Sequence, residues 1–165
     1  HHRQPGLAYA GCMDDDLFAE IICDGFHVIY PVLKLFFKLR GYKNAVLITD
    51  SMLATGMEPG TTNKLGGIKV TVSAEGKVYK EDGGLAGSTL TIDRAVRNLV
   101  SELNMPLMQA VRMASLNPAR LLKFDNNKGS LEQGKDADFI VLNDELEVQA
   151  TYNKGERKFK KDKQE

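Results

Sequence analysis

The sequence lacks several features that mark common classes of protein. Its 165 residues include no tryptophan, only two cysteines, and one histidine away from the start of the chain, His27. Cys12 and Cys23 do not form a C-x-x-C pair, so neither a disulfide framework nor a thiolate zinc site is indicated. The sequence also lacks H-x-H and H-E-x-x-H patterns, so it cannot complete a catalytic zinc site, which usually takes about three protein ligands.

A charge excess of one sign is also missing, because 22 Lys and Arg residues balance 22 Asp and Glu residues. No net field attracts nucleic acid or an anionic membrane, so we expect neither as a partner. The uncharged stretch from Gly25 to Leu33 is about half as long as a membrane-spanning helix. The absence of G-x-S-x-G, P-loop and G-x-G-x-x-G motifs argues against the common hydrolase, NTPase and dinucleotide-binding classes. Because the chain opens without a signal-peptide pattern and has only two cysteines, we expect a non-secreted, cytoplasmic protein.

The first third of the chain has the pattern of a parallel βαβ unit. Residues 19–23 and 45–48 are short apolar runs, and residues 28–39 carry apolar side chains at helical spacing. Strands that are apolar on both faces are typical of a parallel sheet covered on both sides. The two runs are followed by Asp24 and, after a threonine, by Asp50. In such folds, function gathers at the carboxyl ends of the strands.

The rest of the chain changes its pattern twice. Residues 66–80 alternate between apolar and polar side chains around a turn, which predicts an exposed β-hairpin. Two amphipathic helices and then two strands are predicted over residues 92–103, 107–114, 138–142 and 148–152. Asn117 is placed to cap a third, short helix. We expect the charged tail from Arg157 to be solvated.

Three places carry side chains or backbone groups suited to chemistry. His27 lies three residues after Asp24, where the chain turns from strand to helix, and this position favours a site histidine over a structural one. Asp50 either caps the following segment or is a carboxylate on a rigid strand end that binds a metal and moves a proton. The segment 85–88, Leu-Ala-Gly-Ser, is either a turn or a loop whose N–H groups meet a ligand.

Six segments resemble a known family of enzymes: the first five resemble the N-acetylglucosamine-6-phosphate deacetylases, and the sixth resembles the closing segment of the wider amidohydrolase superfamily. They are Arg3-Gln4-Pro5-Gly6, Asp24-Gly25-Phe26-His27-Val28, Leu47-Ile48-Thr49-Asp50, Leu85-Ala86-Gly87-Ser88, Asn117-Pro118-Ala119-Arg120 and Gly134-Lys135-Asp136-Ala137-Asp138-Phe139-Ile140-Val141. The resemblance covers the chain but matches only the C-terminal part of the family's sequence. It implies an α/β fold: residues 1–125 form the C-terminal part of a (β/α)8 TIM-like barrel with a hairpin insertion at 66–80. Residues 126–165 then supply strands of a small β-sandwich and a charged tail.

The resemblance also implies an activity and roles for particular residues. The parent enzyme hydrolyses N-acetylglucosamine 6-phosphate to glucosamine 6-phosphate and acetate. Asp50 matches a catalytic aspartate that touches the metal-bound water and carries its proton. Arg3 matches an arginine that reaches the sugar phosphate of a neighbouring subunit, and its planar guanidinium suits a phosphate dianion. The residues matching substrate-contacting segments are Asp24, His27, Leu85, Ala86 and Gly87.

The cofactor and partners follow from the same resemblance. A divalent metal, with zinc and iron both compatible, would be bound by Asp50 and by ligands upstream of this chain, so we expect the 165 residues alone to be inactive. An amino-sugar phosphate is the expected small-molecule partner, and a homodimer the expected assembly of the parent. His1 and His2 match no metal ligand and stay unassigned between natural and tag residues. Two alternatives remain: a dihydroorotase-like or cytosine-deaminase-like amidohydrolase, which needs no Arg3, and a non-catalytic sugar-phosphate-binding domain.

Overall fold

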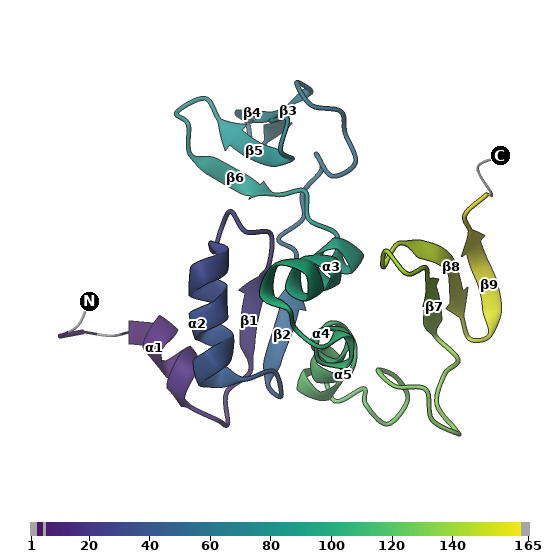
Figure 1. Cartoon of the computed structure of the whole chain (residues 1–165). Coiled ribbons are helices and arrows are strands. Elements are labelled where there is room, and N and C mark those ends of the chain that lie inside the picture. The colour runs from purple at the N-terminus through teal and green to yellow at the C-terminus, as the bar shows by residue number, and fades with distance from the viewer. Residues whose placement is uncertain (1–2, 5, 163–165) are drawn as a thin grey trace.

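The computed structural model describes residues 3–4 and 6–162. Its helices are α1 (Gly6–Met13), α2 (Tyr30–Arg40), α3 (Ile92–Leu103), α4 (Leu107–Ala114) and α5 (Leu116–Leu121). Its strands are β1 (Ala19–Ile22), β2 (Ala45–Ile48), β3 (Thr62–Leu65), β4 (Ile68–Val72), β5 (Lys77–Lys80), β6 (Leu85–Ser88), β7 (Phe139–Leu142), β8 (Val148–Asn153) and β9 (Glu156–Lys160). Figure 1 shows β1 and β2 beside the helices, with β3–β6 above them and β7–β9 to one side.

The predicted βαβ unit is present. β1 and β2 are parallel, with Ile22 paired to Ile48 at their carboxyl ends, and α2 connects them. A proline in the first turn of α2 fixes φ without losing a helical hydrogen bond, and Gly41 ends the helix at a φ of 68°. Leu33 is the fully buried side chain of α2. It joins the central core, whose buried members are Cys23, Leu33, Ala45, Leu47, Leu90, Ala95, Val96, Leu99, Ala110 and Met113.

Asn117 lies inside α5 and does not cap it. Its fully buried side chain donates to the backbone oxygens of Tyr42 and Ala45, each at 2.7 Å, and accepts a hydrogen bond from Arg112 Nε at 3.1 Å. The prediction of a cap was therefore wrong. A buried amide must satisfy its donors and its acceptor, and here the backbone oxygens of Tyr42 and Ala45 satisfy the donors while Arg112 satisfies the acceptor. Asn117 thus fixes α5 against β2.

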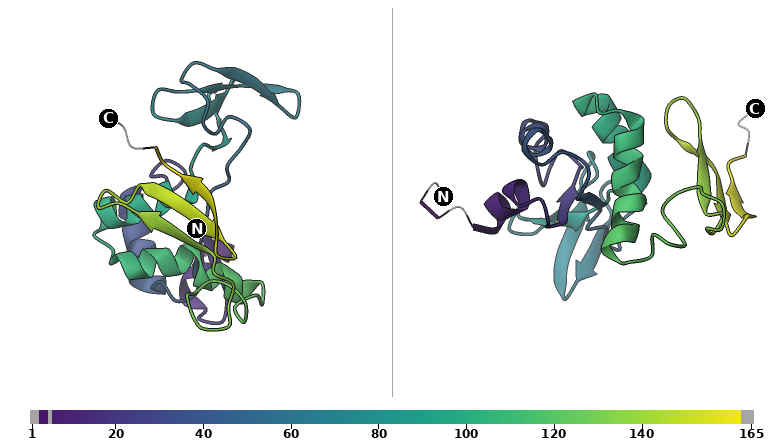
Figure 2. Two further views of the ribbon diagram at one scale, coloured as in Figure 1. Left: turned by 90° about the vertical axis from the view of Figure 1, so that its right-hand side faces the viewer. Right: turned by 90° about the horizontal axis from the view of Figure 1, so that it is seen from below.

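Residues 66–80 belong to a four-stranded antiparallel sheet in the order β3-β4-β5-β6, and not to an isolated hairpin. Its small core contains the buried side chains of Ala54, Val70, Val72, Val78 and Ala86. This cluster shares no buried residue with the central core. The sheet lies over the carboxyl ends of β1 and β2 (Figures 1 and 2).

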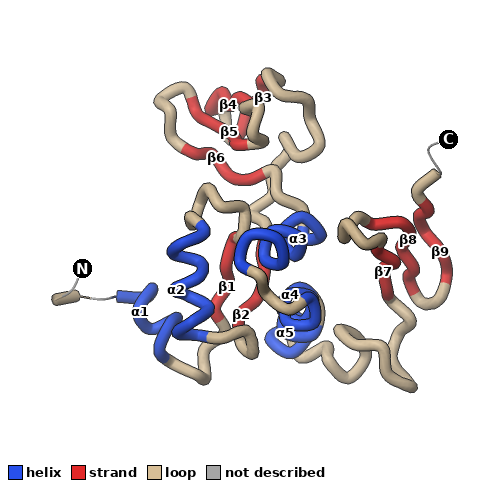
Figure 3. The backbone as a smooth tube through the Cα atoms, in the orientation of Figure 1, coloured by secondary structure: helices blue, strands red, loops and turns tan. Residues whose placement is uncertain are grey.

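The last part of the chain forms a three-stranded antiparallel sheet, β7-β8-β9, after a long connection from α5 (Figure 3). The Phe139 and Tyr152 rings stack across β7 and β8, with centroids 4.3 Å apart. Arg97 of α3 reaches this sheet through a 3.3 Å hydrogen bond to the Leu146 backbone oxygen. The predicted solvated tail is instead strand β9 as far as Lys160, although all of its side chains are exposed. Pairing with β8 overrides its high charge.

Helix α1 has no counterpart in the sequence prediction. It has no buried residue and packs against α2, and Leu7 remains 85% exposed. The exposed face of α2 is also apolar, because Val32, Leu35 and Leu39 recur there at helical spacing. None of the helices formed by the described residues combines the length and the hydropathy that crossing a bilayer requires.

Candidate functional site

Three chain segments meet at the carboxyl ends of the strands. Because Ile22 and Ile48 are paired in the parallel register, Asp24 and Asp50 each lie two residues beyond the same level of the sheet. The next neighbour is the end of β6, where Ser88 forms a parallel bridge with Ser51. Parallel neighbours are about 4.8 Å apart, so the register brings both aspartates and the end of β6 to one edge.

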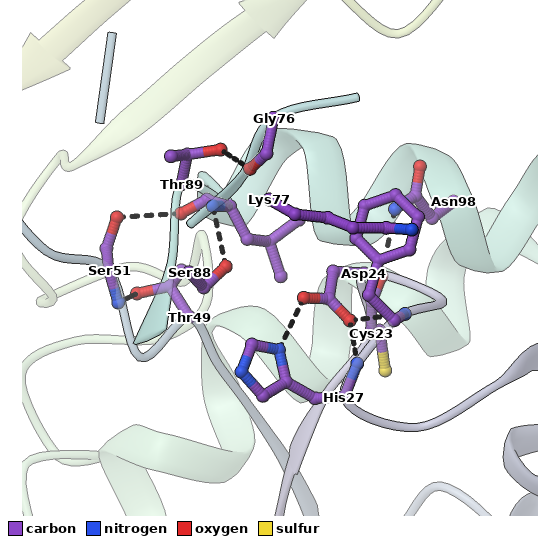
Figure 4. A network of polar contacts seen from close by, with 12 residues as sticks. Cys23, Asp24, His27, Thr49, Ser51, Gly76, Lys77, Ser88, Thr89 and Asn98 are labelled. Atoms are coloured by element: carbon purple, nitrogen blue, oxygen red, sulfur yellow. Dashed lines mark hydrogen bonds and ion pairs between the residues drawn. The ribbon is translucent and has the colours of Figure 1, made fainter. Parts of the chain in front are cut away.

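Asp24 and His27 form a close pair at this edge. Asp24 Oδ2 lies 2.7 Å from His27 Nδ1, and Asp24 Oδ1 accepts hydrogen bonds from the backbone N–H groups of Phe26 (2.8 Å) and His27 (2.9 Å). Figure 4 shows the imidazole turned with this nitrogen toward the carboxylate. An ionised carboxylate only accepts, so Nδ1 carries the proton and Nε2 faces away from the pair.

Electrostatics keep Asp24 ionised. Burial of this 5%-exposed residue would raise its pKa, but the hydrogen bonds from the His27 ring and from the backbone N–H groups of Phe26 and His27 outweigh that effect, so the pKa lies below the ordinary value. The carboxylate therefore orients the His27 ring and fixes its tautomer. This is the arrangement in which a histidine presents its outer nitrogen to a ligand.

One neighbour, Asn98, holds the chain just after β1 in place. Asn98 of α3 donates from Nδ2 to the Cys23 backbone oxygen at 2.9 Å (Figure 4). Cys23 itself is fully buried, and burial, with a smaller contribution from the Asp24 charge, raises the pKa of its thiol to about 12. The thiol therefore stays protonated and is neither a nucleophile nor a metal ligand. Asn98 was not identified from the sequence, because nothing there places it next to β1.

Asp50 has an exposed side chain and a left-handed backbone at φ 49°. Its backbone oxygen accepts the Ser88 N–H at 2.9 Å, which joins the end of β2 to β6. Within the described part of the chain, its carboxylate makes no hydrogen bond or ion pair that would mark it as a helix or turn cap. The geometry therefore disfavours the capping interpretation and leaves the carboxylate available for chemistry.

Leu85, Ala86 and Gly87 form strand β6, and the expected loop is absent. Ala86 is buried in the core of the four-stranded sheet, so its side chain does not reach the site edge. Gly87 has φ 105°, and an added Cβ would lie 3.3 Å from Met52 Sδ and 3.5 Å from the Asp50 backbone oxygen. The positive φ favours glycine here, because an L side chain is strained at this angle, whereas the contact with the Asp50 oxygen alone would be an ordinary one.

Arg3 is exposed and precedes α1, which packs against α2 on the flank of the molecule away from α3–α5 (Figure 1). The structure does not bring Arg3 together with Asp24, His27 and Asp50 in one chain. His1 and His2 lie outside the described residues. The role of Arg3 at a neighbouring subunit's site stays a prediction.

The described residues do not supply the donor set that a metal ion needs. Among residues 3–4 and 6–162, no group of three or more His, Cys, Asp and Glu side chains could hold one. Asp50 supplies a single carboxylate, so the described residues do not fit a catalytic metal centre by themselves. A cavity of about 470 Å³ lies elsewhere, between the β4–β5 turn and the start of α3, and is lined by Glu75, Thr89 and Arg94 among others.

The chain is similar to proteins of known family and structure. The model of the amidohydrolase family matches residues 37–163. An N-acetylgalactosamine-6-phosphate deacetylase from Escherichia coli O157:H7 is 42% identical over 94% of this chain and 41% of its own length. The crystal structure of N-acetylglucosamine-6-phosphate deacetylase from Thermotoga maritima has a TM-score of 0.91 and 35% identity, over 98% of this chain and 44% of that one.

A third relative was solved with a ligand. It is a mutant of the Mycobacterium smegmatis N-acetyl-D-glucosamine-6-phosphate deacetylase in complex with N-acetyl-D-glucosamine 6-phosphate, with a TM-score of 0.86 and 35% identity, over 95% of this chain and 42% of that one. The chain spans about two fifths of the length of these three relatives. The expected resemblance is confirmed: the chain belongs to the amidohydrolase family and, within it, is similar to the hexosamine-6-phosphate deacetylases.

Proposed function

We propose that the chain is the C-terminal catalytic part of a deacetylase that converts N-acetylglucosamine 6-phosphate to glucosamine 6-phosphate and acetate. The observation that carries the proposal is the placement of Asp50 and the Asp24–His27 pair on neighbouring strand ends. The similarity to deacetylases over 94–98% of the chain supports it. It favours this function over the dihydroorotase-like, deaminase-like and non-catalytic alternatives.

In this proposal, the residues of the chain divide the reaction between them. The Asp50 carboxylate takes a proton from water as the water oxygen attacks the acetamide carbonyl carbon. When the carbon–nitrogen bond breaks, Asp50 returns that proton to the departing amine. His27, oriented by Asp24, presents Nε2 to the substrate. The backbone of Leu85–Gly87 lies along the sugar.

A divalent metal, zinc or iron, belongs to this proposal as a cofactor, and members of the amidohydrolase family are generally metal-dependent. Asp50 would be its contact in this chain, and other polypeptide would supply the remaining ligands. The proposed assembly is a homodimer in which Arg3 reaches the partner's substrate phosphate. The proposed compartment is the cytoplasm, which suits the two free cysteines.

A second candidate substrate is N-acetylgalactosamine 6-phosphate, which differs from N-acetylglucosamine 6-phosphate in the configuration at sugar carbon 4. The 42%-identical relative from E. coli O157:H7 is named as an N-acetylgalactosamine-6-phosphate deacetylase. This relative favours testing both sugars.

The test combines the chain with the rest of a relative. In a chimera, this chain replaces the matching segment of the T. maritima deacetylase, and release of acetate is measured with both 6-phosphates. We expect the chimera to deacetylate at least one sugar, and the 165-residue chain alone to show no turnover and no stoichiometric metal by elemental analysis. A folded, metal-loaded chimera that hydrolyses neither sugar would contradict the proposal.

A further inference from the structure

Lys77 lies between two of the segments that are proposed to contact the substrate, strand β6 and the turn between Asp24 and His27. It begins β5, and in the antiparallel register it stands opposite Ser88, the residue after Gly87. Its Nζ lies 4.4 Å from the centroid of the Phe26 ring, which belongs to the turn between Asp24 and His27. Figure 4 shows Lys77 reaching from the β6 side toward this turn. The ammonium group is thus held at the rim of the site.

The contact with Phe26 leaves the hydrogen-bonding capacity of Lys77 unused. A cation–π contact orients the charge over the ring face, while the three N–H donors stay available. Within the described part of the chain, no carboxylate lies within ion-pair distance of Lys77 Nζ, whereas Lys69 of the same sheet pairs with Glu81 at 3.7 Å. The nearby acid, Glu75, is exposed and accepts a 2.9 Å hydrogen bond from Ser73 Oγ, which lowers the pKa of its carboxyl, and the charge of Lys77 makes a smaller contribution in the same direction.

We propose that Lys77 binds the phosphate group of the substrate and so helps to select phosphorylated sugars. This inference rests on the proposed function. A lysine ammonium is a compact positive charge well suited to a phosphate dianion. Because Phe26 already restrains the side chain, less conformational entropy is lost when the phosphate binds. Arg3 would reach the phosphate from a neighbouring subunit, whereas Lys77 belongs to the chain that carries Asp50.

The first test measures binding to the 165-residue chain. Glucosamine 6-phosphate and unphosphorylated glucosamine are titrated while amide chemical shifts of Phe26 and Ser88 are followed by NMR. We expect Lys77→Met to raise the Kd for the 6-phosphate about tenfold and to leave the Kd for glucosamine unchanged. Lys77→Arg should bind like the wild type. Lys64→Met is the matched control, because Lys64 is an exposed lysine on β3 of the same sheet.

The second test uses the chimera and separates this inference from the proposed function. If Lys77 binds phosphate, Lys77→Met raises KM for the 6-phosphate about tenfold with kcat nearly unchanged. Equal binding and equal KM for the wild type and Lys77→Met would overturn the role of Lys77 while leaving the deacetylase assignment intact. Equal losses for both sugars would show that Lys77 only supports the turn. Failure of the wild-type chain to bind the 6-phosphate counts against the inference, and an inactive wild-type chimera would show that the proposed function fails with it.

Discussion

The central α/β core and the four-stranded sheet differ in what they contribute to the site. The core contains large fully buried side chains such as Leu33, Leu99 and Met113, whereas the core of the sheet consists of alanine and valine. Both aspartates of the candidate site come from the α/β unit. The sheet contributes the Gly87 backbone and the Lys77 side chain. In the proposed function, the α/β core positions the reacting groups, while the sheet, whose buried side chains are smaller, contributes to binding of the substrate.

The sharpest way to test the chemical half of this comparison is at Asp50. In the chimera, Asp50→Asn keeps the volume and removes the base, so we expect kcat to fall by ~10²–10⁴. Asparagine also tolerates a left-handed backbone, so the melting temperature should change little. Glu58→Gln, a change at an exposed carboxylate in the loop after β2, is the control. An Asp50→Asn chimera with near-wild-type kcat would move the catalytic base elsewhere.

One truncated side chain in the central core and one in the four-stranded sheet test the difference in packing between the two regions. Leu99→Ala in the core should lower the free energy of unfolding by about 2–5 kcal/mol, and Val78→Ala in the sheet by about 1–2 kcal/mol, because fewer buried carbons are lost. Denaturant unfolding measures both values. Hydrogen exchange should then accelerate in β1 and β2 for Leu99→Ala and in β4–β6 for Val78→Ala. Uniform acceleration in both variants would show that the two clusters unfold as one unit.

Arg3 lies outside both the α/β core and the four-stranded sheet. Its replacement tests recognition of the substrate phosphate, with a smaller expected effect on activity. A charge-assisted contact contributes about 1.5–3 kcal/mol, so Arg3→Ala in the chimera should lower kcat/KM for the 6-phosphate roughly ten- to a hundredfold. Unphosphorylated sugar should lose almost nothing. Mixed dimers that pair Arg3→Ala with Asp50→Asn should regain activity, since the second subunit still donates its arginine. Equal losses for both sugars would assign Arg3 to loop structure.

The smallest expected effect is the pH dependence from Asp24. Its folded-state pKa is below the ordinary 3.8, so its contribution to stability is complete above that value and is lost as the pH falls through the folded-state pKa. Melting temperatures between pH 6 and pH 2.5 should therefore decline less steeply for Asp24→Asn than for the wild type. Asp16→Asn, at an exposed position, serves as the control. Parallel curves for Asp24→Asn and the wild type would contradict the pair with His27.

A continuous apolar run predicted a strand over residues 45–48, and helical periodicity predicted a helix over residues 92–103. The structure confirms residues 45–48 as β2 and residues 92–103 as α3. Helix α1 was missed because its sequence, GLAYAGCM, is apolar on all sides and so shows no helical alternation of apolar and polar residues. Strand β9 was missed because charged side chains suggest solvent, while its pairing with β8 depends on a partner that local sequence does not specify.

The candidate site shows the same limit. Asp24 and Asp50 were identified because each follows an apolar run, which is local information. Lys77 and Asn98 were not, because their places depend on the register of β5 with β6 and on the packing of α3 against β1. A single amino-acid sequence gives no signal for contacts between segments that are distant along the chain.

The residue proposed as the catalytic base, Asp50, has a backbone conformation that costs stability. A left-handed conformation, here at φ 49°, is unfavourable for most residues with a Cβ and costs glycine almost nothing. Asp50→Gly should therefore raise the melting temperature slightly, with a gain of roughly 1 kcal/mol or less, while removing the carboxylate. A screen for heat resistance alone would favour this variant, which the proposed function expects to be inactive. A more stable form of the chain would have to keep Asp50 and gain its stability from substitutions at other positions.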